Sequence, residues 1–521
     1  MRQTTAACAL VTAVVLLALF AFKQGGSGGK ETSLVKLALL PLANLSGEVA
    51  QQYFADEMTD DLIAKLGQIS GLRVIGRASV MKFKQTTNSV AEIARQLNVD
   101  AVIQGTLQRT GDKVQLGVRL FQGSTDRLLW STNYERDLRD LFGLQNEVAL
   151  AVASKLKVKL HPEENGRLVN APRVDPEALD LYYRGRKAIG AAGDANTNNL
   201  EAIRLYKSAL EIDKDFAPAW AALAGAYNAR VYNFEPQPEK RWASDARDAV
   251  LEALRINPNL AAAYEQHGRL LWSPGKNFQH EAALGLLYHA LKLNPSSDGA
   301  LTQLISVYNH TGFFDEALAK IKEVTVLNPL NTNQLAQAAI HLWKGENEQS
   351  LLLWPEVRRQ SMPTFCGSHW ALTLFALGRT DEANAKLQEY LKNYPADVPG
   401  ELTAMKAVLL AAEGKDAESI TQIEEAAKKT KTYFGETHHT TYLIACAYAR
   451  LNKIPEALKW LQQTADTGFP CYPLFAQDPN LDKLRADAGF KDFLKKQEMA
   501  WKTRKADWAK FMGDGKTNGE K

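Results

Sequence analysis

The chain has 521 residues, of which 45% are hydrophobic and 23% charged, so it is globular and not wholly disordered. This length favours about three domains, or one domain followed by a repeat array. Lys and Arg (62) nearly balance Asp and Glu (59), and a net charge of +3 offers no global electrostatic reason to bind nucleic acid. The 4 cysteines, none spaced Cys-x-x-Cys, exclude a disulfide scaffold, a zinc ribbon and a thioredoxin-type site.

Residues 1–30 predict a membrane anchor followed by a tether. Ala6–Phe22 carries no charge and has the length of a short membrane-spanning helix. Large side chains occupy most candidate cleavage positions, so we expect an uncleaved signal-anchor, with a cleaved signal peptide or a buried helix as alternatives. Gln24–Lys30 is Gly-rich and flexible. A short amino-terminal tail most often stays inside the cell. We therefore expect anchoring in the inner membrane, with residues 30–521 periplasmic.

Residues 34–160 predict a small α/β (α+β) domain. In chain order the expected elements are a strand at 34–42, a helix at 51–69, a strand at 71–76, a helix at 90–97, a hairpin of 101–108 and 113–121, a strand at 127–134 and a helix at 138–156. This order predicts one sheet with helices packed on it.

The same segment resembles the TolB amino-terminal-domain-like module of bacterial signalling and envelope proteins. The resemblance is carried, in order, by Leu40–Gly47, Tyr53–Leu62, Leu72–Arg77, Ile93–Asp100, Gly105, Trp130 and Tyr134–Phe142. In that family the module often follows an anchor and a cytoplasmic effector domain, and often precedes tetratricopeptide (TPR) repeats. Few residues precede the apolar run here, so we expect no effector domain on this chain.

An acidic cluster lies in the helix predicted at 51–69. It comprises Asp56, Glu57, Asp60 and Asp61. Carboxylates are favoured near a helix amino terminus, and no His or Cys is close in the sequence. The cluster is therefore expected to be a solvated helix face and not a metal site or an acid/base pair.

Residues 177–470 predict an all-α TPR superhelix of about seven to eight repeats. Pro295 and Pro329 are 34 positions apart, which is the tetratricopeptide period. Small residues such as Ala202 and Ala317 let paired helices approach closely, and proline ends the second helix of a repeat. The pattern resembles the TPR family. Unrelated α-hairpins are the alternative.

The carboxy-terminal residues divide into two predicted parts. Residues 471–494 resemble the cap that covers the last repeat. Residues 495–521 are expected to form a solvated, partly disordered basic tail, although Trp501 and Trp508 could instead mark an interfacial or partner-binding helix.

The concave face of such a superhelix is lined by the first helix of each repeat. The positions that the TPR family directs there are Asn228, Glu265, Arg269, Trp272, Thr302, Ser306, Asn309, His439 and Tyr442. These side chains suit recognition of peptide backbone and carboxylates. We therefore expect a groove for a protein or peptide partner, with ordinary exposed positions as the alternative.

Motifs of known chemistry are absent. No phosphate-binding loop, zinc-protease motif or nucleophile elbow occurs. Cys366–Trp370 places His369 where a cysteine-protease signature has its nucleophile. His438 and His439 are adjacent and cannot chelate a metal together without other ligands. We therefore expect no catalytic, cofactor or metal residues and no small-molecule substrate, and we interpret Cys446 as a packing residue.

Taken together, these features predict a non-enzymatic, membrane-anchored interaction scaffold of the bacterial envelope. One alternative is a regulatory or accessory component of a signalling or transcription-regulating system whose effector is on another chain. Another is an enzyme with an unrecognised site in the α/β domain.

Overall fold

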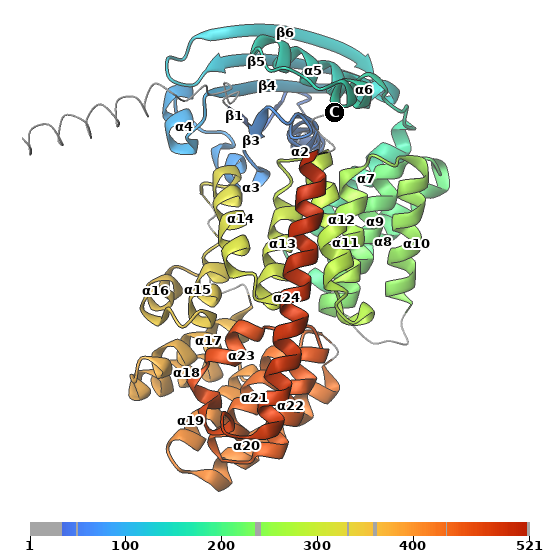
Figure 1. The fold of residues 1–521 in the computed structure, drawn as a ribbon. Coiled ribbons are helices and arrows are strands. Elements are labelled where there is room, and N and C mark those ends of the chain that lie inside the picture. The colour runs from blue at the N-terminus through green and yellow to red at the C-terminus, as the bar shows by residue number, and fades with distance from the viewer. Residues whose placement is uncertain are drawn as a thin grey trace, which may run out of the picture.

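The computed structural model describes residues 34–47, 51–234, 241–330, 333–357, 362–433 and 435–517. The predicted anchor and tether at residues 1–30 lie outside this part of the chain. Within it, no helix combines the length and the apolar character needed to cross a membrane. The described chain is a small sheet domain followed by a mostly helical, TPR-like superhelix (Figure 1).

The amino-terminal domain contains one mixed sheet with the strand order β3-β1-β4-β5-β6. The strands are β1 (Val35–Leu39), β2 (Ala43–Asn44), β3 (Leu72–Val74), β4 (Ala101–Thr110), β5 (Lys113–Gln122) and β6 (Leu128–Asp137). β1 lies parallel to both β3 and β4, and β4, β5 and β6 form an antiparallel meander. Side chains alternate between buried and exposed along β5, so one face of the sheet is directed to the core.

Three helices of this domain, α2, α4 and α5, lie where the sequence predicted them, and two short helices, α3 and α6, were not predicted. In chain order the helices are α2 (Gln52–Leu66), α3 (Arg77–Val80), α4 (Val90–Leu97), α5 (Leu141–Lys155) and α6 (Pro162–Val169). α4 begins where predicted because the Ser89 hydroxyl accepts from the Glu92 amide and the Glu92 carboxylate accepts from the Ser89 amide. α2 packs against α5 and against the first helix of the array, so it joins the two parts of the molecule.

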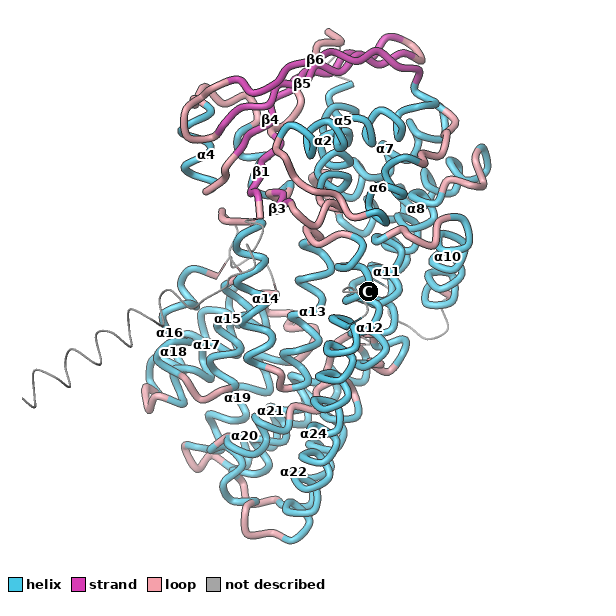
Figure 2. Tube along the Cα trace, turned by 45° about the horizontal axis from the view of Figure 1, so that its top comes forward, coloured by secondary structure: helices cyan, strands magenta, loops and turns pink. Residues whose placement is uncertain are grey.

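Eight antiparallel helix pairs follow in the described residues (Figure 2). They are α7 (Pro176–Ile189) with α8 (Ala195–Ile212), α9 (Ala217–Ala229) with α10 (Trp242–Ile256), α11 (Ala261–Leu271) with α12 (His280–Leu293), α13 (Asp298–Thr311) with α14 (Phe314–Leu327), α15 (Gln334–Trp343) with α16 (Asn347–Leu353), α17 (Pro363–Ala376) with α18 (Thr380–Asn393), α19 (Glu401–Ala412) with α20 (Asp416–Thr432), and α21 (His438–Arg450) with α22 (Ile454–Asp466). Alanines predicted at the crossings, including Ala202 and Ala317, are fully buried. Their small side chains permit this close helix packing.

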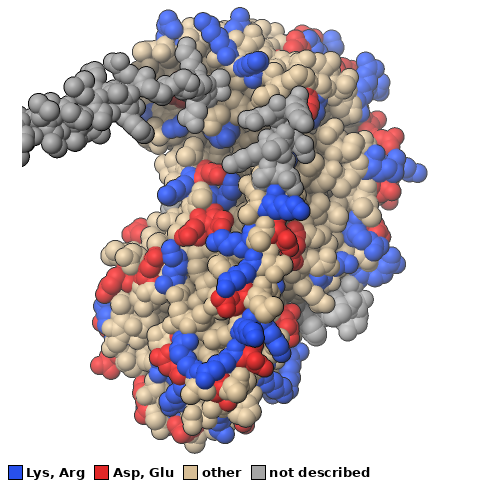
Figure 3. All heavy atoms as spheres, in the orientation of Figure 1, with Lys and Arg blue, Asp and Glu red and all other residues tan. Residues whose placement is uncertain are grey.

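The chain then turns back over the array. A short helix, α23 (Tyr472–Gln477), precedes the long helix α24 (Ala488–Thr517), which runs from the last repeats toward α12 (Figure 1). The Trp508 ring lies 5.8 Å from that of Tyr288 and 6.1 Å from that of Tyr308, and Arg504 Nε is 2.7 Å from Glu281 Oε1. Figure 3 shows basic and acidic side chains interspersed along this face.

Residues 495–512 are thus helical, not partly disordered as predicted, although their side chains are exposed or partly exposed. This segment continues α24 as a helix because Trp501 and Trp508, seven positions apart, fall on one helix face. That face covers aromatic side chains of the middle repeats, which would otherwise be exposed to water.

The sheet domain is seated on the ends of repeats in the middle of the array. The Gly76 amide donates to Leu327 O over 2.7 Å, and the Val74 amide donates to Ser296 Oγ over 3.2 Å. Lys82 Nζ donates to Leu330 O over 2.7 Å. One continuous apolar core joins the sheet domain to the first repeats, so the two parts pack as one body.

Candidate functional site

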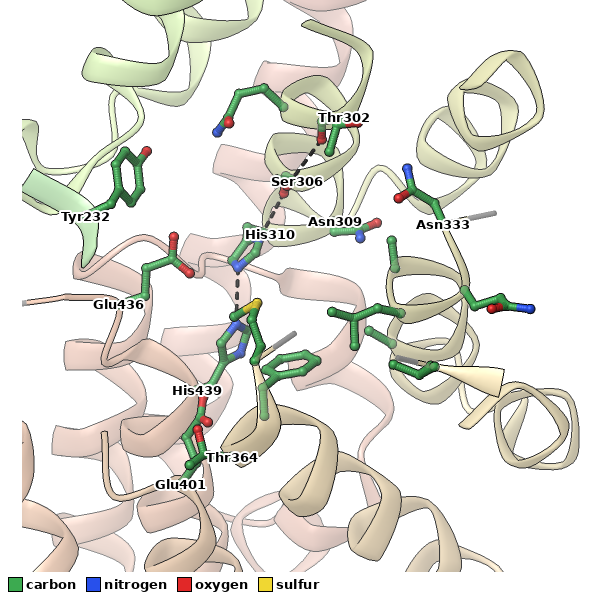
Figure 4. Close-up of a pocket in the computed structure, with 18 of the residues that line it drawn as sticks. Tyr232, Thr302, Ser306, Asn309, His310, Asn333, Thr364, Glu401, Glu436 and His439 are labelled. Carbon is green, nitrogen blue, oxygen red and sulfur yellow. Dashed lines mark hydrogen bonds between the residues drawn. The ribbon is translucent and has the colours of Figure 1, made fainter. Parts of the chain in front are cut away.

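A cavity of about 920 Å³ opens on the inner side of the superhelix. It is lined mainly by first helices of successive repeats, namely α11, α13, α15, α17, α19 and α21. Trp272, Trp343 and Phe365 are large apolar residues of its lining. Amide, hydroxyl and charged side chains, among them Asn309, Ser306 and Glu436, line the same cavity (Figure 4). This mixture of apolar walls and a few polar groups is typical of binding sites.

Six of the nine residues predicted for the groove line this cavity. They are Arg269, Trp272, Thr302, Ser306, Asn309 and His439. Their positions follow from the repeat, because each lies on, or directly after, the first helix of its pair.

The other three predicted residues do not line it. Asn228 Nδ2 donates to Gln266 O of the neighbouring repeat over 2.9 Å. Glu265 accepts from Ser297 Oγ over 2.8 Å, and the Tyr442 hydroxyl donates to Asp478. These side chains are turned into contacts between successive helices, so the structure corrects their predicted place in the groove.

Three cavity side chains have a polar atom without a hydrogen-bond partner in the described structure. They are the side-chain carbonyl oxygen of Asn309, on α13, the side-chain amide nitrogen of Asn333, at the start of α15, and the indole nitrogen of Trp272, directly after α11. All three atoms are buried, and a buried polar atom without a partner costs roughly 1–3 kcal/mol. The lining of the cavity therefore includes one acceptor and two donors without a partner in the described structure.

One arginine and three glutamates also line the cavity: Arg269, Glu356, Glu401 and Glu436. Burial, with smaller contributions from the nearby Asp397 and Glu436 carboxyls, raises the pKa of Glu401 to about 8, although a hydrogen bond with Thr364 acts in the opposite direction. Burial also raises the pKa of Glu436 to about 7, although the Arg269 guanidinium acts in the opposite direction. At neutral pH the Glu401 carboxyl is therefore mostly protonated and can donate a hydrogen bond.

Histidines from distant segments meet at one wall of the cavity. His310 Nε2 on α13 lies 3.2 Å from His439 Nε2 on α21, and Glu436 is close to both (Figure 4). Burial lowers the pKa of His310 to about 4, so its ring is neutral at pH 7. The sequence singled out His438 and His439 but missed His310 and Glu436. No local pattern marks a residue that meets a partner so far along the chain.

The acidic cluster of α2 is not a solvated face. Glu57 is only 5% exposed, and the Arg186 guanidinium of α7 forms ion pairs with Glu57, Asp60 and Asp61. Arg186 Nε lies 2.7 Å from Glu57 Oε2. The prediction failed because the neutralising arginine lies in the first repeat, which docks on this face of the helix. Burial raises the pKa of Glu57 to about 7 despite Arg186 and Arg77.

Cys446 lies fully buried on α21, in agreement with its interpretation as a packing residue. His369 is also buried, and its Nδ1 is 3.0 Å from Phe365 O, within α17. Its environment is that of a core side chain.

Known proteins resemble separate parts of this chain. Residues 33–150 match the family described as "HilA/YgeH-like transcriptional regulator, second domain". The TolB-like resemblance is not confirmed by this match and stays a prediction. A protein of Rhizobium meliloti (strain 1021), named "Putative adenylate cyclase 3", is 37% identical over 188 residues, which are 36% of this chain and 32% of that protein.

A second relative, a chloroplastic protein of Arabidopsis thaliana, is 26% identical over 110 residues, or 21% of this chain and 32% of that protein. The chain thus spans about a third of the length of the curated relatives it matches.

Solved structures with similarity include TPR proteins. A tetratricopeptide repeat protein from Parabacteroides merdae ATCC 43184 is 15% identical, with a TM-score of 0.36, and covers 49% of this chain and 94% of its own. Pseudomonas aeruginosa pilF is 20% identical, with a TM-score of 0.33, and the match covers 42% of this chain and 93% of the pilF chain. Because these scores are low, the helix pairs of the structure itself define the TPR-like array.

Proposed function

We propose that this protein is an interaction scaffold whose inner cavity holds an extended segment of a protein partner. The observation that carries the proposal is that two asparagines, through Asn309 Oδ1 and Asn333 Nδ2, leave a polar atom unsatisfied in a cavity lined by repeat helices. The backbone of an extended peptide offers one N–H donor and one C=O acceptor per residue. The peptide backbone would therefore supply a hydrogen-bond partner to each asparagine, whichever side chains the partner carries.

The remaining lining supports this mode of binding. Trp272, Trp343 and Phe365 are large apolar surfaces that can accept apolar side chains of the segment. Arg269 is the cation of the lining and can pair with a carboxylate of the partner. The segment we propose is therefore extended, with apolar side chains and an acidic residue.

The scaffold is proposed to act at a membrane. The apolar run Ala6–Phe22 supports a signal-anchor, with the sheet domain and the repeats in the periplasm. Confinement to a surface raises the effective concentration of a membrane-bound partner, so that modest affinity suffices. We propose neither nucleic acid nor a small-molecule substrate as its ligand.

The experiment first identifies the partner by crosslinking the full chain in membranes. The affinity of the purified full chain for the partner segment is then compared with that of Asn309→Leu and Asn333→Leu. Because leucine removes atoms that have no partner in the free protein, these variants should keep the melting temperature. Their affinity should fall by about tenfold, corresponding to about 1.4 kcal/mol per lost hydrogen bond.

Lys322→Ala serves as the control, since Lys322 is an exposed residue of α14 outside the cavity. It should bind as the unmodified chain does. Unchanged affinity in both asparagine variants would refute the proposed role of the cavity.

A second candidate is a regulatory component of a signalling or transcription-regulating system. It is favoured by the likeness of residues 33–150 to a regulator domain and of 188 residues to a protein named as a cyclase. Here the sheet domain would carry the recognition and the effector would be on another chain. This candidate would be favoured if the full chain captures a cyclase or transcription regulator. Capture should then be lost when surface residues of β6 are changed, and kept in Asn309→Leu.

A further inference from the structure

Four potential metal ligands converge between α13 and the start of α21. His310, Glu436, His438 and His439 each offer one ligand atom, and these atoms all lie within 4.8 Å of one another. The histidines are 7%, 0% and 4% exposed. Two of these residues and the carboxylate belong to one short segment, and His310 comes from a helix more than 120 positions earlier.

Hydrogen bonds determine which nitrogen of two rings is protonated. His310 Nδ1 lies 2.7 Å from Ser306 O, and His438 Nδ1 lies 2.9 Å from Thr467 O. A carbonyl oxygen only accepts, so both Nδ1 atoms carry the hydrogen. In the neutral rings, Nε2 then presents a lone pair. Histidine ligands of metals are held in this way, with the other ring N–H donated to a carbonyl or carboxylate.

The lone pair of His438 has no partner among the described residues, although its Nε2 is buried. His310 Nε2 is directed at His439 Nε2 over 3.2 Å. Two nitrogens at about 2.0–2.1 Å from a tetrahedral zinc ion are about 3.3–3.4 Å apart, so the observed separation fits one edge of such a site. A hydrogen bond between these two rings alone would leave His438 unsatisfied.

We propose that His310, His438, His439 and Glu436 bind a divalent transition-metal ion of the zinc class. Three imidazoles and one carboxylate suit the tetrahedral coordination and borderline softness of Zn²⁺. All four positions come from the protein, as in structural zinc sites, so the ion closes the site without a water ligand.

The consequence is mechanical. The ion joins α13, in the middle of the array, to α21, in its last pair, and so clamps the superhelix where it turns back on itself. Because His310, Glu436 and His439 also line the cavity, the clamp holds one of its walls. This inference is independent of the proposed partner, since it concerns the binding of the ion alone.

The test uses the purified full chain. We expect one zinc ion per chain by elemental analysis, removal by a chelator, and a rise in melting temperature when Zn²⁺ alone is added back. Absence of the ion together with no shift on adding Zn²⁺ would overturn the proposal.

Variants then locate the ion. His438→Gln and Glu436→Gln should lose the zinc-dependent shift. His369→Gln should keep it, because His369 is a buried histidine of the same region that is not among the four ligands. A shift that persists in both ligand variants would place the ion elsewhere and refute the assignment.

If the ligand variants fail to fold, the visible absorption spectrum of Co²⁺ bound to the unmodified chain tests the site instead. Tetrahedral Co²⁺ gives intense visible absorption bands, whereas octahedral Co²⁺ gives weak ones. Tetrahedral bands that Zn²⁺ displaces support the site, and weak bands or none refute it.

Discussion

Arg186 on α7 holds together the contact between the sheet domain and the array, and its removal is the sharpest test of that contact. Its guanidinium forms ion pairs with Glu57, Asp60 and Asp61 of α2, and the Tyr183 hydroxyl donates to Asp61 over 2.6 Å. The charged atoms of Arg186 and Glu57 are mostly buried, with side chains 18% and 7% exposed. Arg186→Met would preserve the side-chain stem and remove only the charge.

The expected loss follows from the burial of the carboxylates. Removing one partner of a buried ion pair costs about 3–5 kcal/mol, because the remaining charge is left without compensation. Here three carboxylates lose the same cation, and Arg77, 3.5 Å from Glu57, offsets part of the loss. We expect about 3–5 kcal/mol at pH 8. The matched control Arg204→Met breaks an exposed pair with Glu201 and should leave the stability nearly unchanged, because water screens that pair.

The loss should also depend on pH. The pKa of Glu57 is already raised to about 7 in the intact protein, chiefly by burial, and it rises further without Arg186. A raised carboxyl pKa means that the folded state binds more protons than the unfolded state, so stability falls as pH rises from about 4.5 through 7. The deficit of Arg186→Met should therefore be small at pH 5 and largest at pH 8.

Urea denaturation at both pH values measures the loss, and hydrogen exchange of α2 and α7 shows whether it is local to this contact. Adding Glu57→Gln to Arg186→Met should recover part of the stability at pH 8. A deficit below about 1 kcal/mol, or one equal at pH 5 and pH 8, would show that the carboxylates do not depend on Arg186 and would refute the reasoning.

Three further predictions concern the array. The pKa of Glu401 is raised to about 8, so this carboxyl lowers the free energy of unfolding by about 4 kcal/mol between pH 5 and pH 8, at about 1.4 kcal/mol per pKa unit. Glu401→Gln should abolish this pH dependence. Equal pH profiles of the variant and the unmodified chain in urea denaturation would contradict the prediction. Gly312 has φ +75°, and an added Cβ would lie 2.5 Å from a proline of α23, whereas Gly378, with φ +76°, has open space around it. Gly312→Ala should therefore cost about 1–3 kcal/mol more than Gly378→Ala, and equal melting temperatures would count against the packing of α23. Trp508→Ala should lower the free energy of unfolding by about 2 kcal/mol, because apolar burial is lost. Met499 is 62% exposed on the same helix, so Met499→Ala should cost less than about 0.5 kcal/mol. Similar denaturation midpoints for the two variants would mean that α24 does not pack on the array.

Much of the fold was predictable because its signals are local. The alternation in β5 and the capping box before α4 depend only on neighbours in the chain. The 34-residue spacing of Pro295 and Pro329 reports a repeated unit, and α13 and α14 lie between these prolines. Where the repeat directs a side chain inward, as at Asn309, the place in the cavity followed as well.

Side chains whose partners are distant were predicted poorly. The acidic cluster of α2 looks like a solvated face until Arg186 docks on it. Tyr442 occupies a groove position of its repeat, but the returning chain supplies Asp478 and buries it. The rings of the two adjacent histidines of α21 have centroids 4.5 Å apart, and only the closure of the superhelix brings His310 to them.

The sequence alone therefore determined most of the helices and strands, their order and the repeating unit, since these depend on periodicity and on neighbours within a few residues. Only the tertiary structure decided which side chains are charged, buried or able to share a ligand. Those properties depend on what is packed against each group, and contacts such as Arg186 with Glu57 join residues more than 120 positions apart.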